Sequence, residues 1–257
     1  MTWGNMLSSS LKLLLLTPLI LVHYNINEIA FWYLLLTINS FAIVIDFGFY
    51  PTFSRLVSYV YHGLESINLI NSPKKNSTSD PNWLLMARVY GTVNVTYLFL
   101  SFFILVIVFG FTYLSIHDVI ARTDKPSELW AAYIVYAFSV FISFFSKKFY
   151  AVIVGTNNIV VINRWDIVNN VANAITSILI VYFELSLFYL ALNQLLFSVL
   201  LVVRDFLLER SICSGKFKSF KFFSFDKEIF QACWGPTWSN FLLCVNHLIF
   251  SISGLFL

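Results

Sequence analysis

The sequence predicts an all-α polytopic membrane protein with about seven transmembrane helices, and three observations favour this fold class. Of its 257 residues, 59% are hydrophobic and only 11% are charged, whereas about a quarter of the residues in a soluble domain are charged. Its 28 Phe, 13 Tyr and 7 Trp exceed the needs of one soluble core and suit lipid-facing surfaces and interfacial belts. Long apolar runs are present and alternating ten-residue strands are absent, so helices should cross the bilayer.

The same composition argues against several function classes. The net charge of +3 is weak, and there is no basic stripe with interleaved aromatic residues, so we expect no nucleic-acid partner. The cysteines form no CxxC pair, the histidines lack metal-ligand spacing, and no nucleotide-binding or hydrolase motif occurs. We therefore expect no metal, no cofactor and no enzyme activity.

The first two expected helices cover residues 5–23 and 28–48. The first contains Lys12 and could pass for a signal peptide, but the small-residue cleavage pattern is missing, so an uncleaved helix is predicted. Pro51 then opens an amphipathic helix over 51–62, because proline suits the first helical position. Its apolar residues recur at helical spacing: Phe53, Leu56, Val57, Val60 and Tyr61. The opposite face is expected to be polar: Thr52, Ser54, Arg55, Ser58 and His62.

Five further apolar segments are predicted to be membrane helices: residues 84–115, 130–154, 159–182, 185–204 and 228–257. Polar connections separate them. The loop over 63–82 is centred on Asn71-Ser72-Pro73-Lys74-Lys75, the loop over 116–129 is charged, and Gly155-Thr156-Asn157-Asn158 makes a tight connection. The loop over 205–227 is basic and aromatic, which favours a position on the lipid surface.

We therefore expect three regions: an N-terminal six-helix bundle over 1–204, a cytoplasmic loop over 205–227, and a seventh helix over 228–257 that begins a second bundle. In this last helix, Trp234-Gly235-Pro236-Thr237-Trp238 should bend or break the helix, because proline lacks an N–H donor.

The distribution of Lys and Arg predicts that the N-terminus is cytoplasmic. With that orientation, thirteen of the sixteen basic residues fall on the inner side, whereas Arg122 and Lys125 fall outside and Lys12 lies in the first helix. The inner group comprises Arg55, Lys74, Lys75, Arg88, Lys147, Lys148, Arg164, Arg204, Arg210, Lys216, Lys218, Lys221 and Lys227.

Ionisable side chains at membrane depth are costly, so they mark candidate functional sites. Asp46 lies near the inner end of the second helix. It is an interfacial cap, a structural partner for Arg55, or a proton or ion site that faces the bundle interior.

Three cations are candidates for binding an anionic substrate. Lys147 and Lys148 lie deep in the helix over 130–154, and either extend to the headgroups or attract an anionic ligand. Adjacent residues lie about 100° apart on a helix, so both lysines cannot face the same way. Arg164 is followed by Trp165 and Asp166, and is either an interfacial anchor or a third cation of the same site.

One stretch also carries a family resemblance. It combines Phe31-Trp32-Tyr33, Ile45-Asp46-Phe47-Gly48-Phe49, Pro51-Thr52-Phe53-Ser54-Arg55 and Ser58-Tyr59, and ends at Gly63. This stretch resembles the signature near the start of bacterial polysaccharide flippases. Those proteins export O-antigen and capsule repeat units and belong to the multidrug/oligosaccharidyl-lipid/polysaccharide exporter superfamily.

The resemblance implies two six-helix bundles around a central cavity in the bacterial inner membrane. Its substrate would be a polyprenyl-diphosphate-linked oligosaccharide, moved across the membrane by alternating access, with membrane lipids as the other partner. Family members have about twelve or more helices, whereas seven are predicted here. We therefore expect either a truncated, inactive fragment or two copies that assemble as a homo-oligomer.

Two other functions remain open. One is export of drugs or metabolites by a member of the same superfamily. The other is an enzyme of surface-polysaccharide synthesis embedded in the membrane, whose essential polar residues would lie in the outer loop over 116–129, among them Asp118 and Asp124.

Overall fold

A computed structural model of the protein describes residues 2–46, 48–65, 80–123, 125–221 and 223–253. Within these ranges all regular structure is helical, which confirms the predicted all-α class. Among the described residues, three helical segments are long and apolar enough to cross a membrane: Trp83–Gly110, Pro126–Gly155 and Leu187–Ser211.

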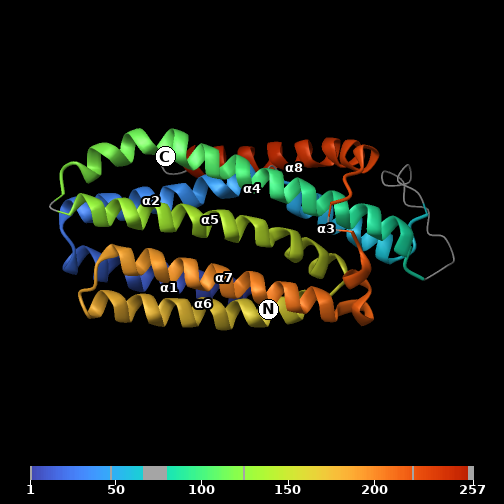
Figure 1. Ribbon diagram of the computed structural model, residues 1–257, viewed down its shortest axis with the longest axis horizontal. Helices are drawn as coiled ribbons and strands as arrows, with labels where there is room; N and C mark the ends of the chain where they lie inside the picture. Colours follow the sequence, from blue (N-terminus) through green and yellow to red (C-terminus); the bar gives the residue numbers. More distant parts are fainter. Residues whose placement is uncertain (1, 47, 66–79, 124, 222, 254–257) are drawn as a thin grey trace. The chain divides into compact units, whose positions relative to one another are not determined.

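The helices follow the predicted order (Figure 1). They are α1 (Thr2–His23), α2 (Ile26–Ile45), α3 (Phe49–Tyr61), α4 (Trp83–Ile120), α5 (Pro126–Gly155), α6 (Ile159–Tyr182), α7 (Leu187–Ser211), the 3-10 helix η2 (Ile212–Ser219) and α8 (Lys227–Ser253). The centre of the predicted loop over 63–82 lies outside the described residues.

Two of the predicted loops are too long. α4 continues to Ile120 and α5 begins at Pro126, so the charged loop predicted over 116–129 is much shorter. α7 continues to Ser211, so the first part of the loop predicted over 205–227 is helical. In both places charged residues interrupt an apolar run without ending the helix, because charges on one face leave the helical hydrogen bonds intact.

The chain forms two compact units. The first comprises Met1–Ala42, Ser101–Ser146 and Ile159–Arg204, and the second comprises Ile43–Leu100, Lys147–Asn158 and Asp205–Leu257. In the first unit α1 packs along α6, and in the second unit α3 packs along α8 (Figure 1).

The amphipathic helix α3 has the predicted apolar face. Its stripe is buried at four positions: Phe53, Leu56, Val57 and Val60. The prediction for Thr52 is wrong: it was expected on the exposed polar face, but its side chain is buried. Its hydroxyl accepts a hydrogen bond of 3.1 Å from Asn240 Nδ2 of α8 and donates one of 2.9 Å to the Gly48 carbonyl.

Two glycines let α3 approach its neighbours closely. Gly48 precedes α3 with φ of +78°, and an added Cβ would lie 2.6 Å from Asn240 Cβ. Gly155 ends α5, where an added Cβ would lie 2.6 Å from Val57 Cβ. The tight connection after Gly155 is confirmed, with Asn157 in the left-handed region at φ 65°.

Helix α8 is not broken at its proline. It runs without interruption from Lys227 to Ser253 with Pro236 inside it, so of the expected bend or break the break is wrong and the bend stays a prediction. Proline still removes the donor that would pair with the carbonyl of Ala232, one turn earlier. That residue lines the pocket described below.

Candidate functional site

The second unit contains an acid–base pair between α5 and the end of α2. Lys147 Nζ lies 3.8 Å from Asp46 Oδ2, and the Tyr97 hydroxyl of α4 donates a hydrogen bond of 3.2 Å to Asp46 Oδ1. Tyr97 and Asp46 are buried, and the Lys147 side chain is 31% exposed. Among the described residues Asp46 therefore pairs with Lys147, not with Arg55, which was one of the alternatives.

Lys148, the next residue of α5, belongs to a second buried group in the same unit. It is only 2% exposed, and its Nζ donates a hydrogen bond of 3.2 Å to Asn94 Oδ1. Its charge interacts with that of Glu209 on α7, which is also 2% exposed. Glu209 Oε2 accepts a hydrogen bond of 3.0 Å from the Tyr90 hydroxyl.

Helical periodicity explains how these side chains converge. Tyr90, Asn94 and Tyr97 lie at i, i+4 and i+7 on α4 and share one face. Asp205 and Glu209 are likewise i and i+4 on α7, and both are buried. Lys147 and Lys148 differ by about 100° around α5, which agrees with their separate partners.

The second group contains polar atoms that lack partners. Among the described residues, neither Glu209 Oε1 nor Asn94 Nδ2 has a hydrogen-bond partner, although both atoms are buried. An unsatisfied buried polar atom costs about 1–3 kcal/mol. The carboxylate oxygen can accept a proton or a cation, and the amide nitrogen can donate to an anion.

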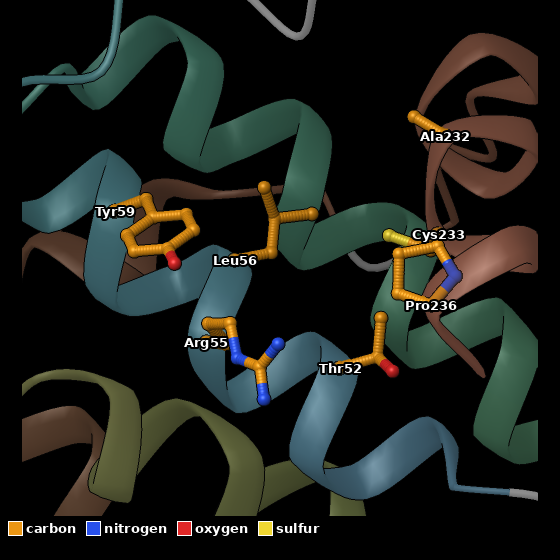
Figure 2. Close-up of a pocket in the computed structure, with 7 residues that line it drawn as sticks. All are labelled: Thr52, Arg55, Leu56, Tyr59, Ala232, Cys233 and Pro236. Carbon is orange, nitrogen blue, oxygen red and sulfur yellow. The ribbon is translucent and has the colours of Figure 1, made fainter. Parts of the chain in front are cut away.

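Arg55 lines a separate pocket between α3 and α8 (Figure 2). The pocket has a volume of about 70 Å³. Its lining comprises Thr52, Arg55, Leu56, Tyr59, Ala232, Cys233 and Pro236. The polar members from α3 belong to the stretch that carries the family resemblance, and Arg55 supplies a cation beside a mostly apolar wall. This arrangement can hold one small anionic group.

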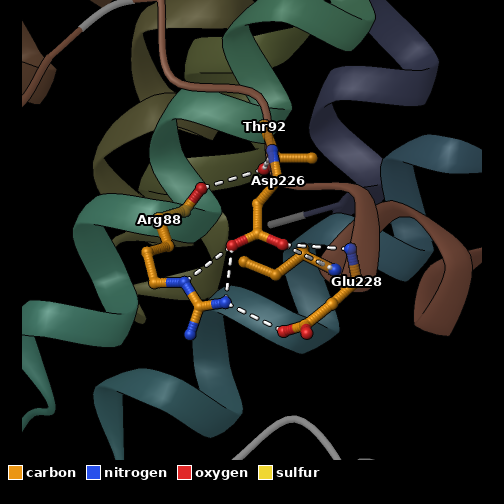
Figure 3. A network of polar contacts seen from close by, with 5 residues as sticks. Arg88, Thr92, Asp226 and Glu228 are labelled. Carbon is orange, nitrogen blue, oxygen red and sulfur yellow. Dashed lines mark hydrogen bonds and ion pairs between the residues drawn. The ribbon is translucent and has the colours of Figure 1, made fainter.

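A polar network attaches the start of α8 to α4 (Figure 3). Arg88 donates to Asp226 Oδ2 over 2.6 Å and to Glu228 Oε2 over 3.1 Å. Asp226 Oδ1 in turn accepts the backbone N–H groups of Glu228 and Ile229, so Asp226 is the N-cap of α8. Partial burial raises the pKa of the Asp226 carboxyl, but the hydrogen bonds from Arg88 and the backbone outweigh it and the pKa falls below its usual value.

The first unit holds a different buried polar network. Lys12 Nζ donates to Asn173 Oδ1 over 3.0 Å and to Gln194 Oε1 over 3.3 Å. Asn193 Nδ2 also donates to Asn173 Oδ1, over 3.0 Å, and to Ser177 Oγ, over 3.1 Å. These contacts join α1, α6 and α7 through neutral amides and one cation, and they fix the rotations of the three helices.

Arg164 lies on α6 in this first unit and is exposed. Asp166, two residues on, makes an ion pair of 2.7 Å with Arg204 Nη1, and both side chains are 13% exposed. The predicted grouping of Arg164 with Lys147 and Lys148 stays a prediction.

No cluster of three or more His, Cys, Asp or Glu side chains with metal-binding geometry occurs in the described part of the chain. Cys233 is a buried free thiol. A scan against protein-family models and searches of curated proteins and of solved structures found no match to this chain.

The sequence singled out Asp46, Lys147 and Lys148 as candidate site residues, but it did not predict which side chains they contact. Glu209 and Asp205 were assigned to a loop, although their spacing of four residues beside Phe206, Leu207 and Leu208 is a helical signal. The face of α4 formed by Tyr90, Asn94 and Tyr97 carried a similar signal.

Proposed function

We propose that this chain is a membrane transporter that resembles the lipid-linked oligosaccharide flippases. In this proposal seven helices cross the bacterial inner membrane, the N-terminus is cytoplasmic, and the substrate is a polyprenyl-diphosphate-linked oligosaccharide. The observation that carries the proposal is the burial of two charged side chains, Lys148 and Glu209, on two helices that are long and apolar enough to cross a membrane.

Buried charges at membrane depth support transport because they are costly to retain and usually face an interior pathway. Lys148 and Glu209 are nearly inaccessible, and each has a neutral hydrogen-bond partner, Asn94 and Tyr90 respectively. A purely structural role explains these charges less well, because apolar side chains of similar volume are often as stabilising as buried charged ones.

The balance of charges supports a coupled mechanism. Each lysine has a carboxylate whose charge it senses: Lys147 lies 3.8 Å from Asp46, and Lys148 interacts over a longer distance with the charge of Glu209. A diphosphate headgroup must compete with these carboxylates for the lysines. Protonation of Glu209 would release Lys148 to bind the headgroup, and loss of the proton would restore the pair and expel the substrate. Substrate movement would thus be linked to a proton gradient without covalent chemistry.

The proposal is tested by surface polysaccharide in cells deleted for the gene, with the 257-residue chain restored. We expect recovery with the unaltered chain and loss of recovery with Lys148→Met. Lys218→Met is the matched control, because Lys218 is exposed on η2. Surface polysaccharide that is unchanged by the deletion would overturn the proposal and favour drug or metabolite export.

A further inference from the structure

A second pocket, of about 160 Å³, lies in the first unit where three helix connections meet. Its described walls come from the start of α2, from the α4–α5 connection with the first turn of α5, and from the start of α7: Asn25, Asn27, Glu28, Arg122, Thr123, Lys125, Glu128, Leu129, Ser186 and Leu187. Four of the lining side chains are charged: Glu28, Arg122, Lys125 and Glu128.

Hydrogen bonds hold these connections together. The Tyr24 hydroxyl donates to the Leu185 carbonyl over 2.5 Å, and Asn27 Nδ2 donates to the Arg122 carbonyl over 2.9 Å. Glu28 Oε2 accepts the backbone N–H of Asn25 over 3.0 Å, which orients its carboxylate. The pocket wall is therefore organised before any ligand enters, which lowers the cost of binding.

The four charged side chains do not neutralise one another. Across the ranges that the structure describes, no ion pair within 4.0 Å joins Glu28, Arg122, Lys125 or Glu128 to another side chain. Ser186 Oγ also lines this pocket region, is buried, and has no hydrogen-bond partner among the described residues. Two acids, two bases and one hydroxyl therefore remain available to a ligand that carries both signs of charge.

The position of the pocket indicates where such a ligand comes from. α5 and α7, whose first residues lie at the pocket, are both apolar enough to cross a membrane from Pro126 and Leu187 onward. The pocket thus lies at the depth of lipid headgroups if these helices span the bilayer. Next to it, Ile26 and Leu185 expose apolar side chains that acyl chains can cover.

We propose that this pocket binds the headgroup of a zwitterionic phospholipid of the phosphatidylethanolamine type. The primary ammonium donates hydrogen bonds to Glu28 and Glu128, while the phosphate accepts from Arg122, Lys125 and the Ser186 hydroxyl. The ligand has no net charge, and neither do the four described charged side chains of the pocket taken together. An anionic phosphatidylglycerol would leave the carboxylates unpaired, and the quaternary ammonium of phosphatidylcholine has no N–H to donate. The inference goes beyond the proposed function, and it requires only that α5 and α7 cross a membrane.

Native mass spectrometry of the detergent-purified full chain tests this site. The chain is incubated with phosphatidylethanolamine, phosphatidylglycerol or phosphatidylcholine of identical acyl chains, and the retained lipid is counted. We expect about tenfold preference for phosphatidylethanolamine, the effect of roughly one charge-assisted hydrogen bond. The double variant Glu28→Gln/Glu128→Gln should lose this preference, whereas Lys125→Gln should weaken retention of both phosphatidylethanolamine and phosphatidylglycerol.

Glu184→Gln is the matched control, since Glu184 is exposed in the α6–α7 connection and does not line the pocket. It should retain the wild-type preference. Soluble phosphoethanolamine added to the wild-type chain tests whether the free headgroup binds as the intact lipid does. Displacement of the lipid means that the headgroup alone suffices for binding. No displacement means that the acyl chains contribute to binding. This competition experiment uses only the wild-type chain, so it does not depend on the folding of any variant.

Equal retention of all three lipids by the wild-type chain would overturn the inference, as would an unchanged preference in the double glutamine variant. Because no transport is measured, either result leaves the proposed transporter function to be judged by the export assay.

Discussion

The Tyr90 hydroxyl donates a hydrogen bond of 3.0 Å to Glu209 Oε2, and this contact joins α4 to α7 inside the second unit. Both side chains are buried. The residues are 119 positions apart in the chain, so the contact depends on the tertiary arrangement of two helices rather than on local sequence.

Removing this hydroxyl should destabilise the protein. Because Glu209 Oε1 already lacks a partner among the described residues, Tyr90→Phe leaves the carboxylate without this hydrogen bond as well. We expect a loss of about 1.5–3 kcal/mol, the range for hydrogen bonds to charged groups. Thermal unfolding in detergent measures it. Tyr113→Phe on the exposed part of the same helix should change stability little, and equal effects of the two variants would contradict the assigned contact.

The two adjacent lysines should differ in function. Lys148 is enclosed with Glu209 and Asn94, whereas the Lys147 side chain is partly exposed and lies 3.8 Å from Asp46. Removal of the buried charge leaves the Glu209 carboxylate without its counter-charge, so Lys148→Met should abolish export. Lys147→Met should reduce export only partly. The readout is surface polysaccharide at matched protein levels in the membrane, and equal tolerance at both positions would refute the predicted role of these cations.

The helices could be predicted because each depends on local information. Apolar spacing located α3, and the tight connection after Gly155 was visible as Gly-Thr-Asn-Asn. The pairings were harder. One of the roles expected for Asp46 was to pair with Arg55, nine residues away, while its partner in the structure, Lys147, comes from a distant helix. Nothing in the spacing of single residues encodes which helices meet.

The errors at helix ends have a related cause. Asp205 and Glu209 were placed in a loop because charge was taken as a sign of water, but both are buried, and Glu209 accepts a hydrogen bond from Tyr90 on another helix. The N-cap at Asp226 is a local feature, but its hydrogen bond with Arg88 on α4 depends on the tertiary arrangement. Such sites are where tertiary contacts override the local pattern.

A pair of glycines on α4 should respond to alanine in opposite ways. At Gly91 an added Cβ would lie 2.4 Å from the Ser224 carbonyl oxygen, a contact with backbone that cannot move aside easily. At Gly110 nothing lies within 4 Å of the added atom. Gly91→Ala should therefore destabilise the protein, and Gly110→Ala should stabilise it by up to about 1 kcal/mol, the intrinsic helix preference of alanine. Thermal unfolding of both variants decides the point, and a stabilising Gly91→Ala would contradict the close approach of residue 224.

Asp226 should make stability depend on pH. Partial burial raises the pKa of its carboxyl, but hydrogen bonds from Arg88, Ile229 and Glu228 bring the folded-state pKa below the ordinary value. A carboxyl with a lowered folded-state pKa stabilises the protein above its unfolded-state pKa of about 3.9, and this contribution disappears as the pH falls through the folded-state pKa. We therefore expect the contribution of Asp226 to be complete at neutral pH and to decline only below about pH 4.

Two substitutions separate the charge of Asp226 from its capping role. Asparagine is as good an N-cap as aspartate, so Asp226→Asn should keep the cap but remove the pH-dependent part of the stability. Asp226→Ala should lose the cap as well, at a further cost of about 1 kcal/mol. Denaturant unfolding of the wild type, Asp226→Asn and Asp226→Ala at neutral and acidic pH measures both effects. Subtracting the unfolding free energy of Asp226→Asn from that of the wild type cancels the titration of the other carboxyls. A difference in unfolding free energy between the wild type and Asp226→Asn that stayed constant down to about pH 3, below the usual carboxyl pKa, would contradict the prediction. The Asp226 charge would then not stabilise the protein through its ion pair with Arg88.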